Sequence, residues 1–274
     1  MIQQGLDIIP SANFARADIT LLPPPEHLQQ WVQCLWLKPP QKRSTAQRFT
    51  DKFYPDAGAS ISFEISTTNV RATFLHQAQV LTQSWTSEYG LLSVRLHPGA
   101  AGALLGLHIG DKSNLQLNLA ESDFLHSYVA QKSQFMVLLD SLAEMDLVQG
   151  AKAVLAWLER LVTLNQVQEN RLLPLLKLTS SNLLLPEQLA AQVGVSRRTL
   201  ERRCKNGLGF TPLQLLSFSQ IRRARQRLIN TKDSLGEVAL SCGYYDQAHF
   251  TNAFHKHTLE TPQQYRLRKL SSDC

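Results

Sequence analysis

The sequence has few cysteines and lacks a long apolar run. Its four cysteines are scattered over 274 residues, without the spacing of a metal site or a disulfide framework. The most apolar stretch, residues 100–107, is far shorter than the roughly 20 residues of a membrane-spanning helix. The first ten residues lack the charged start and apolar run of a secretory signal. We therefore expect a cytoplasmic protein with no membrane contact, no metal and no cofactor.

Positive and negative residues are unevenly distributed along the chain, whose net charge is +6. From Arg171 onward there are 16 Lys+Arg and 7 Asp+Glu, whereas residues 1–170 hold 12 and 15. A solvated helix surface would mix both signs. A basic half favours a partner that carries phosphate groups. The length has room for two domains of ordinary size.

A short helix, a turn, a capping residue and a second helix are predicted in the basic half. Leu189, Ala190 and Val193 place apolar groups on one helical face. Gly194 supplies the permissive backbone of a tight turn, and Ser196 is a favoured N-cap for the next helix. This order is typical of a helix-turn-helix.

The same pattern recurs about fifty residues further along the chain. Val238 lies in the first helix, Gly243 in the turn, and Asp246 is the N-cap of the second helix. Phe250 and Phe254, at i and i+4, are expected to hold that helix to the core. The sequence therefore predicts two helix-turn-helix units.

A long helix is predicted between the two units, from Thr211 to Asn230. Thr211 followed by Pro212 is a cap with proline at the first helical position. Apolar residues then follow helical spacing beside an arginine-rich flank: Leu215, Phe218, Ile221, Ala224 and Leu228. Such a linker could hold two reading helices on one face of DNA, where major-groove visits are roughly 34 Å apart.

With these residues the chain resembles AraC-type transcription regulators over residues 183–268. The shared positions are Leu189-Ala190, Ser196 to Arg203, Gly209 to Pro212, Arg222 to Leu228, Val238-Ala239, Gly243 to Phe250, Phe254 and Thr261-Pro262. The family usually has a large apolar residue and then glycine where this chain has Thr258 and Leu259. It usually has phenylalanine where this chain has Cys204. The resemblance implies double-stranded DNA as a partner.

The resemblance also implies which side chains meet DNA. The expected base contacts are Arg198, Glu201, Arg202, Gln247, Ala248, His249 and Asn252. Arginine can bridge guanine, glutamate can accept from cytosine, glutamine and asparagine suit adenine, and alanine can touch a thymine methyl. The expected contacts to the DNA backbone, which position without specifying, are Ser196, Arg197, Arg203, Lys205 and Thr251.

The acidic half is predicted to be rich in strands. Residues 59–66 alternate strictly, with Ile61, Phe63 and Ile65 on one face. Further strands are expected at 31–37, 70–75, 91–96 and 115–119, after an extended arm over residues 1–30. The fold class is therefore α+β, with a small barrel or sandwich preceding an all-helical module.

Two segments of this half resemble landmarks of the cupin-like sensor domains that precede the module in part of the family. They are Pro55 to Gly58 and Arg95 to Ala100. Pro98-Gly99 is predicted to be a turn, followed by a short helix or loop. Between residues 121 and 164 the apolar spacing becomes helical. These helices either pack on the barrel or form a dimer interface. The polar run 163–170 is the expected linker between domains 1–165 and 166–274.

Catalysis is not expected. The histidines of the N-terminal half are widely spaced: His76, His97, His108 and His126. His255 and His257 are close together but are expected on the surface of the module. Cys34 stands alone in an apolar strand, whereas alkyl transfer to a thiol needs a reactive cysteine in a defined cluster.

We interpret the chain as a sequence-specific DNA-binding transcription regulator that reads two successive major-groove segments. A small effector bound to the N-terminal domain, or a homodimer formed by it, would modulate the module. An activator would also contact RNA polymerase. The alternative is a constitutive or architectural DNA binder whose N-terminal domain only mediates protein contacts.

Overall fold

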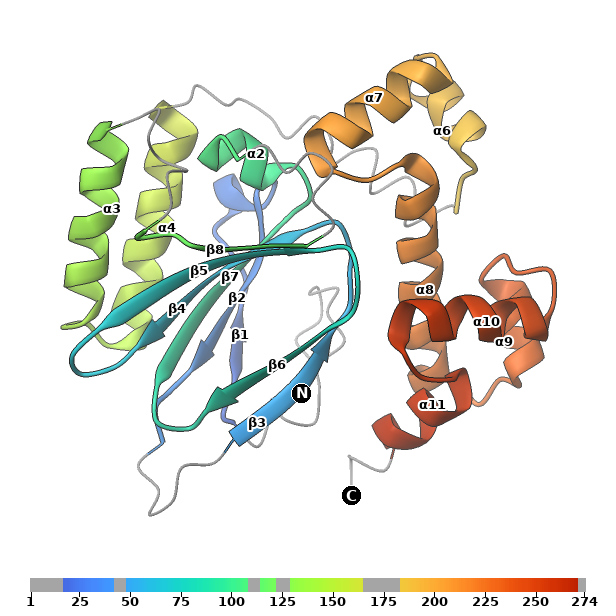
Figure 1. The fold of residues 1–274 in the computed structure, drawn as a ribbon, viewed down its shortest axis with the longest axis horizontal. Helices are drawn as coiled ribbons and strands as arrows, with labels where there is room; N and C mark the ends of the chain where they lie inside the picture. Colours follow the sequence, from blue (N-terminus) through green and yellow to red (C-terminus); the bar gives the residue numbers. More distant parts are fainter. Residues whose placement is uncertain (1–16, 42–47, 108–113, 122–128, 165–182, 271–274) are drawn as a thin grey trace.

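A computed structural model describes residues 17–41, 48–107, 114–121, 129–164 and 183–270. Strands dominate the first half of the chain and helices the second, so the α+β fold class is confirmed (Figure 1). In the described ranges, no helix is long and apolar enough to cross a membrane.

Six strands form one antiparallel sheet in the order β1-β2-β7-β4-β5-β8. Their bounds are β1 Thr20–Leu22, β2 Val32–Lys38, β4 Ala59–Ile65, β5 Val70–Gln77, β7 Gly90–Leu96 and β8 Asn114–Asn118. Two further strands, β3 Arg48–Phe53 and β6 Leu81–Thr86, pair with each other in a separate antiparallel sheet. The expected strand-rich half is present.

The alternation along β4 separates an apolar face from a polar face. Ile61 and Phe63 are fully buried, and they stand opposite Val94 and Leu92 of β7. On the other face, the hydroxyls of Ser62 and Ser93 lie 2.8 Å apart. The period-two pattern of the sequence therefore sets both the register and the buried side of the sheet.

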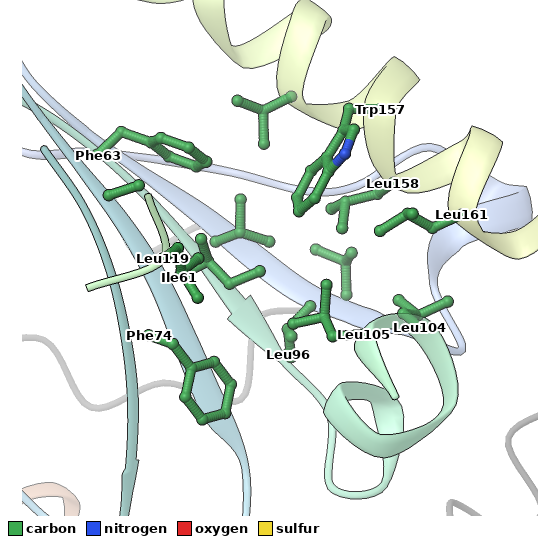
Figure 2. Packing of buried hydrophobic residues seen from close by; sticks show 14 of the residues in the cluster. Ile61, Phe63, Phe74, Leu96, Leu104, Leu105, Leu119, Trp157, Leu158 and Leu161 are labelled. Atoms are coloured by element: carbon green, nitrogen blue, oxygen red, sulfur yellow. The ribbon is translucent and has the colours of Figure 1, made fainter. Parts of the chain in front are cut away.

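Among the described residues, three helices cover the apolar face: α2 Ala100–Leu105, α3 Val129–Leu142 and α4 Leu147–Leu164. Figure 2 shows Trp157, Leu158 and Leu161 of α4 directed toward the sheet residues Ile61 and Phe63. The ring centres of Trp157 and Phe135 are 5.1 Å apart. Of the two alternatives for these helices, packing against the sheet is thus confirmed.

Several element bounds differ from the sequence expectations. The extended arm contains β1 and a 3-10 turn, η1 Glu26–Leu28, while residues 1–16 lie outside the described ranges. Strands β3 and β6 were not predicted, because their polar residues resemble those of loops. The expected linker begins too early, since residues 163 and 164 are the last turn of α4. The rest of that linker lies outside the described residues.

Within residues 183–270, the described part of the C-terminal module, the structure has six helices (Figure 1). They are α6 Pro186–Gln192, α7 Arg197–Leu208, α8 Pro212–Asn230, α9 Leu235–Ser241, α10 Gln247–Thr258 and α11 Pro262–Leu270. Helix α8 contributes to two separate cores. Leu215 and Phe218 pack with α6 and α7, whereas Ile221, Ala224 and Leu228 pack with α9, α10 and α11. The linking helix thus joins both helix-turn-helix units by its own buried side chains.

Candidate nucleic-acid interface

The first helix-turn-helix, α6 and α7, has the predicted local structure. Gly194 has φ 66°, a left-handed conformation that glycine adopts without strain. The hydroxyl of Ser196 accepts a hydrogen bond from the amide of Thr199 at 3.2 Å and so caps α7. Leu200 and Cys204 are fully buried. The outward face of α7 is thereby fixed by the core on its opposite side.

The second helix-turn-helix, α9 and α10, repeats this arrangement. Gly243 has φ 78° in the turn, and the Asp246 carboxylate accepts from the amide of His249 at 2.7 Å. The rings of Phe250 and Phe254 are fully buried with their centres 5.5 Å apart. Both N-caps predicted from the sequence are therefore confirmed.

The side chains expected at base edges lie on exposed helix surfaces. Six of them are exposed and Glu201 is partly buried; the six are Arg198, Arg202, Gln247, Ala248, His249 and Asn252. They come from α7 and α10, the second helix of each unit. The His249 ring meets the Tyr244 ring edge-on at 5.4 Å, which limits its freedom. The accessible positions agree with the predicted roles, which stay predictions.

Arg197 already has partners within the protein. Its guanidinium donates to Glu201 at 3.0 Å and also pairs with Glu187 of α6. The hydrogen bond to Glu201, followed by the charges of Glu187 and Glu201, raises the pKa of Arg197. Arg197 thus joins α6 to α7 and holds the Glu201 carboxylate in position. To contact a DNA phosphate, Arg197 would have to give up its bonds to Glu187 and Glu201.

Two hydroxyls expected to contact the DNA backbone are also engaged. Ser196 donates to the Thr199 hydroxyl at 3.0 Å, and Thr251 donates to the carbonyl of Gln247 at 2.8 Å. A hydroxyl has a single donor hydrogen, so each would have to turn away from its present acceptor to reach a phosphate. Arg203 is exposed and Lys205 is half-buried. Of the five residues expected to contact the DNA backbone, Arg203 could therefore reach a phosphate with the least rearrangement.

Helix α8 separates the two units. Thr211 caps it by accepting from the amide of Gln214 at 3.3 Å, and Pro212 occupies its first position, as predicted. Its 19 residues correspond to about 28 Å at 1.5 Å per residue. Figure 1 places α6 and α7 at one end of α8, and α9 and α10 at the other.

The family departure at residues 258 and 259 does not disrupt the end of α10. Leu259 takes the left-handed C-cap position with φ 56°, where the family usually has glycine. The Thr258 hydroxyl is buried; it lies 2.7 Å from the carbonyl of Phe254 and 2.9 Å from that of Glu260. These contacts offset the burial of a polar group, and the turn is retained at the cost of backbone strain at Leu259.

Tyr245 was missed by the sequence reasoning. Its side chain is 87% exposed, directly before the N-cap of α10. The available signal was the tyrosine pair directly before Asp246. Tyr244 is the buried ring.

The two cupin-like landmarks lie in contact. Arg95 forms an ion pair with Asp56 and donates to the Ser60 hydroxyl at 3.0 Å. Burial raises the pKa of Asp56, but the Arg95 guanidinium and the Gly58 amide together outweigh it, so the pKa lies below its usual value. This ion pair ties the end of β7 to the segment before β4.

The thiols and histidines show no catalytic arrangement within the described ranges. Cys34, Cys204 and Cys242 are buried free cysteines, and burial raises the pKa of Cys34 to about 12. Such a thiol is unreactive. His257, expected on the surface, instead meets the Phe218 ring edge-on at 6.0 Å, and burial lowers its pKa. His108 and His126 lie outside the described residues.

Comparisons with known proteins agree with this geometry. Residues 189–268 match a family described as a helix-turn-helix domain, and residues 20–118 match a domain of unknown function (DUF6597). The transcriptional activator RhaS of Klebsiella pneumoniae is 29% identical over 141 residues, 52% of this chain and 47% of that protein. The regulator ArgR of Pseudomonas aeruginosa is 37% identical over 83 residues, 30% of this chain and 25% of that protein. The chain spans about half the length, or less, of these curated relatives.

A solved structure is also similar. A transcriptional regulator from Chromobacterium violaceum, described as having an AraC-type DNA-binding domain, is 34% identical; the match covers 35% of this chain and 88% of that one, with a TM-score of 0.34. The fold and the two capped helices define a protein with a double helix-turn-helix module. The C-terminal module belongs to the AraC-type family of transcription regulators. Its named relatives are regulators and not enzymes.

Proposed function

We propose that this protein is a sequence-specific transcription regulator that reads two successive major-groove segments of DNA with α7 and α10. The observation that carries the proposal is the placement of two capped helices at the two ends of α8, each with an exposed polar row. The basic balance of the module supports attraction to phosphate groups.

The base contacts proposed are those of the sequence analysis. On α7, Arg198 and Arg202 would bridge guanines, and Glu201 would accept from cytosine. On α10, Gln247 and Asn252 would meet adenines, beside Ala248 and His249. Exposure of six of these side chains supports the assignment, and Glu201 is partly buried.

The remaining roles extend from this assignment. The strand-rich domain, proposed as residues 1–165, would bind a small effector or form a homodimer, while residues 166–274 bind DNA. Exposed apolar side chains on α3 and α4, namely Met136, Val137 and Val148, offer a surface for a second copy. An activating role, as in the name of RhaS, would require contact with RNA polymerase.

The test is selection of fragments of the source organism's genomic DNA by the whole chain at roughly physiological salt. Non-specific binding weakens steeply under these conditions, whereas specific recognition survives. Recovery of one or a few sites near promoters, each with two blocks about one helical turn apart, is expected. Diffuse recovery without a shared site would favour an architectural DNA binder, provided that the protein is folded and retains non-specific affinity.

A further inference from the structure

A continuous row of aromatic rings runs from the strand-rich half to the second reading helix. The row begins at the partly buried Tyr54, just after β3, and ends at the exposed His249 of α10. Each ring contacts the next, in the order Tyr54, Tyr265, Phe254, Phe250, Tyr244 and His249. The row therefore joins a residue outside the DNA-binding module to a side chain proposed to contact a base.

The rings of this row are closely packed. Successive ring centres lie 6.2, 5.5, 5.5, 5.2 and 5.4 Å apart, within the range of about 4.5–7 Å that is typical of favourable aromatic pairs. The four inner rings are buried, with exposed fractions of 6% or less. Because a packed interior leaves little free volume, a ring that is displaced at one end of the row must shift its neighbours.

Tyr54 is fixed at its end of the row by charged partners. The Arg225 guanidinium of α8 lies 3.6 Å from the ring centre, and the Tyr54 hydroxyl donates to Glu260 at 2.9 Å. Lys52 of β3 pairs with Glu260 at 3.6 Å and donates to the carbonyl of Thr258, the last residue of α10, at 3.4 Å. The chain at and just after β3 therefore holds the end of α10 as well as the row of rings.

His249 is the end of the row that faces solvent. Its ring meets the buried Tyr244 ring edge-on, and its amide donates to the N-cap Asp246 at 2.7 Å. A side chain that recognises a ligand must be held within about 0.5 Å of its productive position, by the packing of the residues around it. For His249 this packing is the row that begins at Tyr54.

The first reading unit contacts the strand-rich half through other residues. Ala57 packs in the core shared by α6, α7 and α8, and the His76 ring lies 5.1 Å from the Phe210 ring, which precedes α8. These residues are not members of the row. A change at Tyr54 should therefore affect the second unit and spare the first.

We propose that Tyr54 is a positioning residue for base recognition by α10, which acts through the row of rings and does not itself touch DNA. The strand-rich half thereby contributes to recognition of the second block, the DNA segment that α10 contacts. A ligand or partner that moved the chain after β3 would alter recognition of this block and leave the other unchanged. The inference rests on the proposed function, because it assigns α10 to one block of a DNA site.

The experiment is competition binding of the whole chain to its selected site, with each block varied one base at a time. Discrimination in a block is the ratio of affinities for the correct and the altered base, so a uniform change in affinity cancels. Tyr54→Leu removes the ring, and Tyr54→Phe removes the hydroxyl alone. Arg225→Met removes the cation that holds the ring. Tyr89→Leu, at a 45% exposed tyrosine of the same half, is the matched control.

A second measurement needs no DNA. The ring signals of His249 are followed by nuclear magnetic resonance in the free protein and are assigned by their loss in His249→Gln. Because the environment of an aromatic neighbour alters these signals, they report whether a change at Tyr54 reaches the other end of the row.

Tyr54→Leu should lower discrimination in the second block about threefold or more, the size of coupling that networks of packed side chains carry. Discrimination in the first block should be unchanged, which also shows that the variant is folded. Arg225→Met should give a smaller loss, again in the second block alone. Tyr54→Phe and Tyr89→Leu should retain discrimination in both blocks. The His249 signals should move in Tyr54→Leu and stay in place in Tyr89→Leu.

Three results overturn the inference: an unchanged second block in folded Tyr54→Leu, equal losses in both blocks, or equal effects of Tyr54→Leu and Tyr54→Phe. If Tyr54→Leu does not fold, an unchanged second block in Arg225→Met overturns it. If the parent protein selects no DNA site, the proposed function fails. The inference then fails separately only if the His249 signals do not move in either Tyr54→Leu or Arg225→Met.

Discussion

The guanidinium of Arg225 lies 3.6 Å from the centre of the Tyr54 ring and so joins the linking helix α8 to the segment after β3. Around this contact the Tyr54 hydroxyl donates to Glu260 at 2.9 Å, and the Tyr54 and Tyr265 rings meet edge-on at 6.2 Å. Tyr54 thus joins the strand-rich half to α8, to α11 and to Glu260, which also pairs with Lys52 of β3.

The first prediction concerns this pair. Cation–π contacts shielded from water stabilise by about 1–2 kcal/mol. In a double-mutant cycle, Tyr54→Leu and Arg225→Met should show a coupling of about 1 kcal/mol in urea unfolding. The control cycle pairs Arg225→Met with Tyr89→Leu, an exposed tyrosine directly before β7, and should be additive. Additive effects in both cycles would mean that the ring contact contributes nothing.

The second prediction concerns reading of DNA by α7. Arg202→Ala should weaken binding to the selected site by about 1–3 kcal/mol and relax one base position, because an exposed arginine of α7 would no longer bridge a guanine. Arg160→Ala removes the same charge from α4 and should change neither property. Competition binding against sites varied one base at a time measures both. An unchanged base preference would mean that Arg202 does not contact a base.

The third prediction concerns Gly58. A Cβ at this position would lie 2.7 Å from the carbonyl oxygen of Leu96, so the backbone must shift. Overpacking of this kind costs about 1–3 kcal/mol, and Gly58→Ala should lower the free energy of unfolding by that amount. Gly102→Ala is the control, because its Cβ would lie 3.5 Å from the nearest atom and alanine favours a helix. Thermal unfolding of the two variants checks the contrast.

The fourth prediction concerns Leu259. This residue is 62% exposed and left-handed, so its side chain contributes little packing while its backbone is strained. The left-handed conformation costs an L-residue about 1–2 kcal/mol, and Leu259→Gly should raise the stability by up to about 1 kcal/mol after the entropic cost of glycine. Leu267→Gly, at an exposed leucine within α11, should be destabilising. Equal losses from both would show that Leu259 is not strained.

The fifth prediction concerns the loss of stability at low pH that is due to Glu260. Burial raises the pKa of Glu260, but hydrogen bonds from Arg268 and Tyr54, with the charges of Arg268 and Lys52, hold it below its usual value. Its contribution to stability is therefore present above the unfolded pKa of about 4.3 and is lost as the pH falls through the folded value. In Glu260→Gln the free energy of unfolding should fall less steeply below about pH 4.3 than in the unmutated protein. In Glu88→Gln, at an exposed residue, its pH dependence should be unchanged. Urea midpoints across pH measure this.

The parts of the structure that follow from neighbouring residues were predictable. Ser196, Asp246 and Thr211 cap their helices through bonds to an amide three residues away, so the sequence alone locates each helix start. Strand β4 was equally clear, because Ile61 and Phe63 alternate with polar residues. The unpredicted strands β3 and β6 pair with each other. Each has only two large apolar residues on one face, separated by a polar residue, so the alternation is too weak to mark a strand.

The contacts between distant segments could not be predicted in this way. The sequence marked Pro55 to Gly58 and Arg95 to Ala100 as separate landmarks, and only the fold brings Asp56 to Arg95. The pocket lined by Tyr54, Arg222 and Lys269 forms where α8 and α11 lie against the strand-rich half, which no local pattern encodes. Likewise, the commitment of Arg197 to Glu187 and Glu201 required the packing of α6 against α7.

Because α8 supplies residues to both cores, neither helix-turn-helix unit can turn about the linking helix without breaking its own packing. If both units read DNA, the fixed distance and orientation between them require a fixed spacing between the two blocks of the DNA site. One base pair inserted between its two blocks would rotate one block about the DNA axis by about 34–36°, given 10–10.5 base pairs per turn. A target site of this regulator should therefore tolerate base changes within its spacer far better than a change in spacer length.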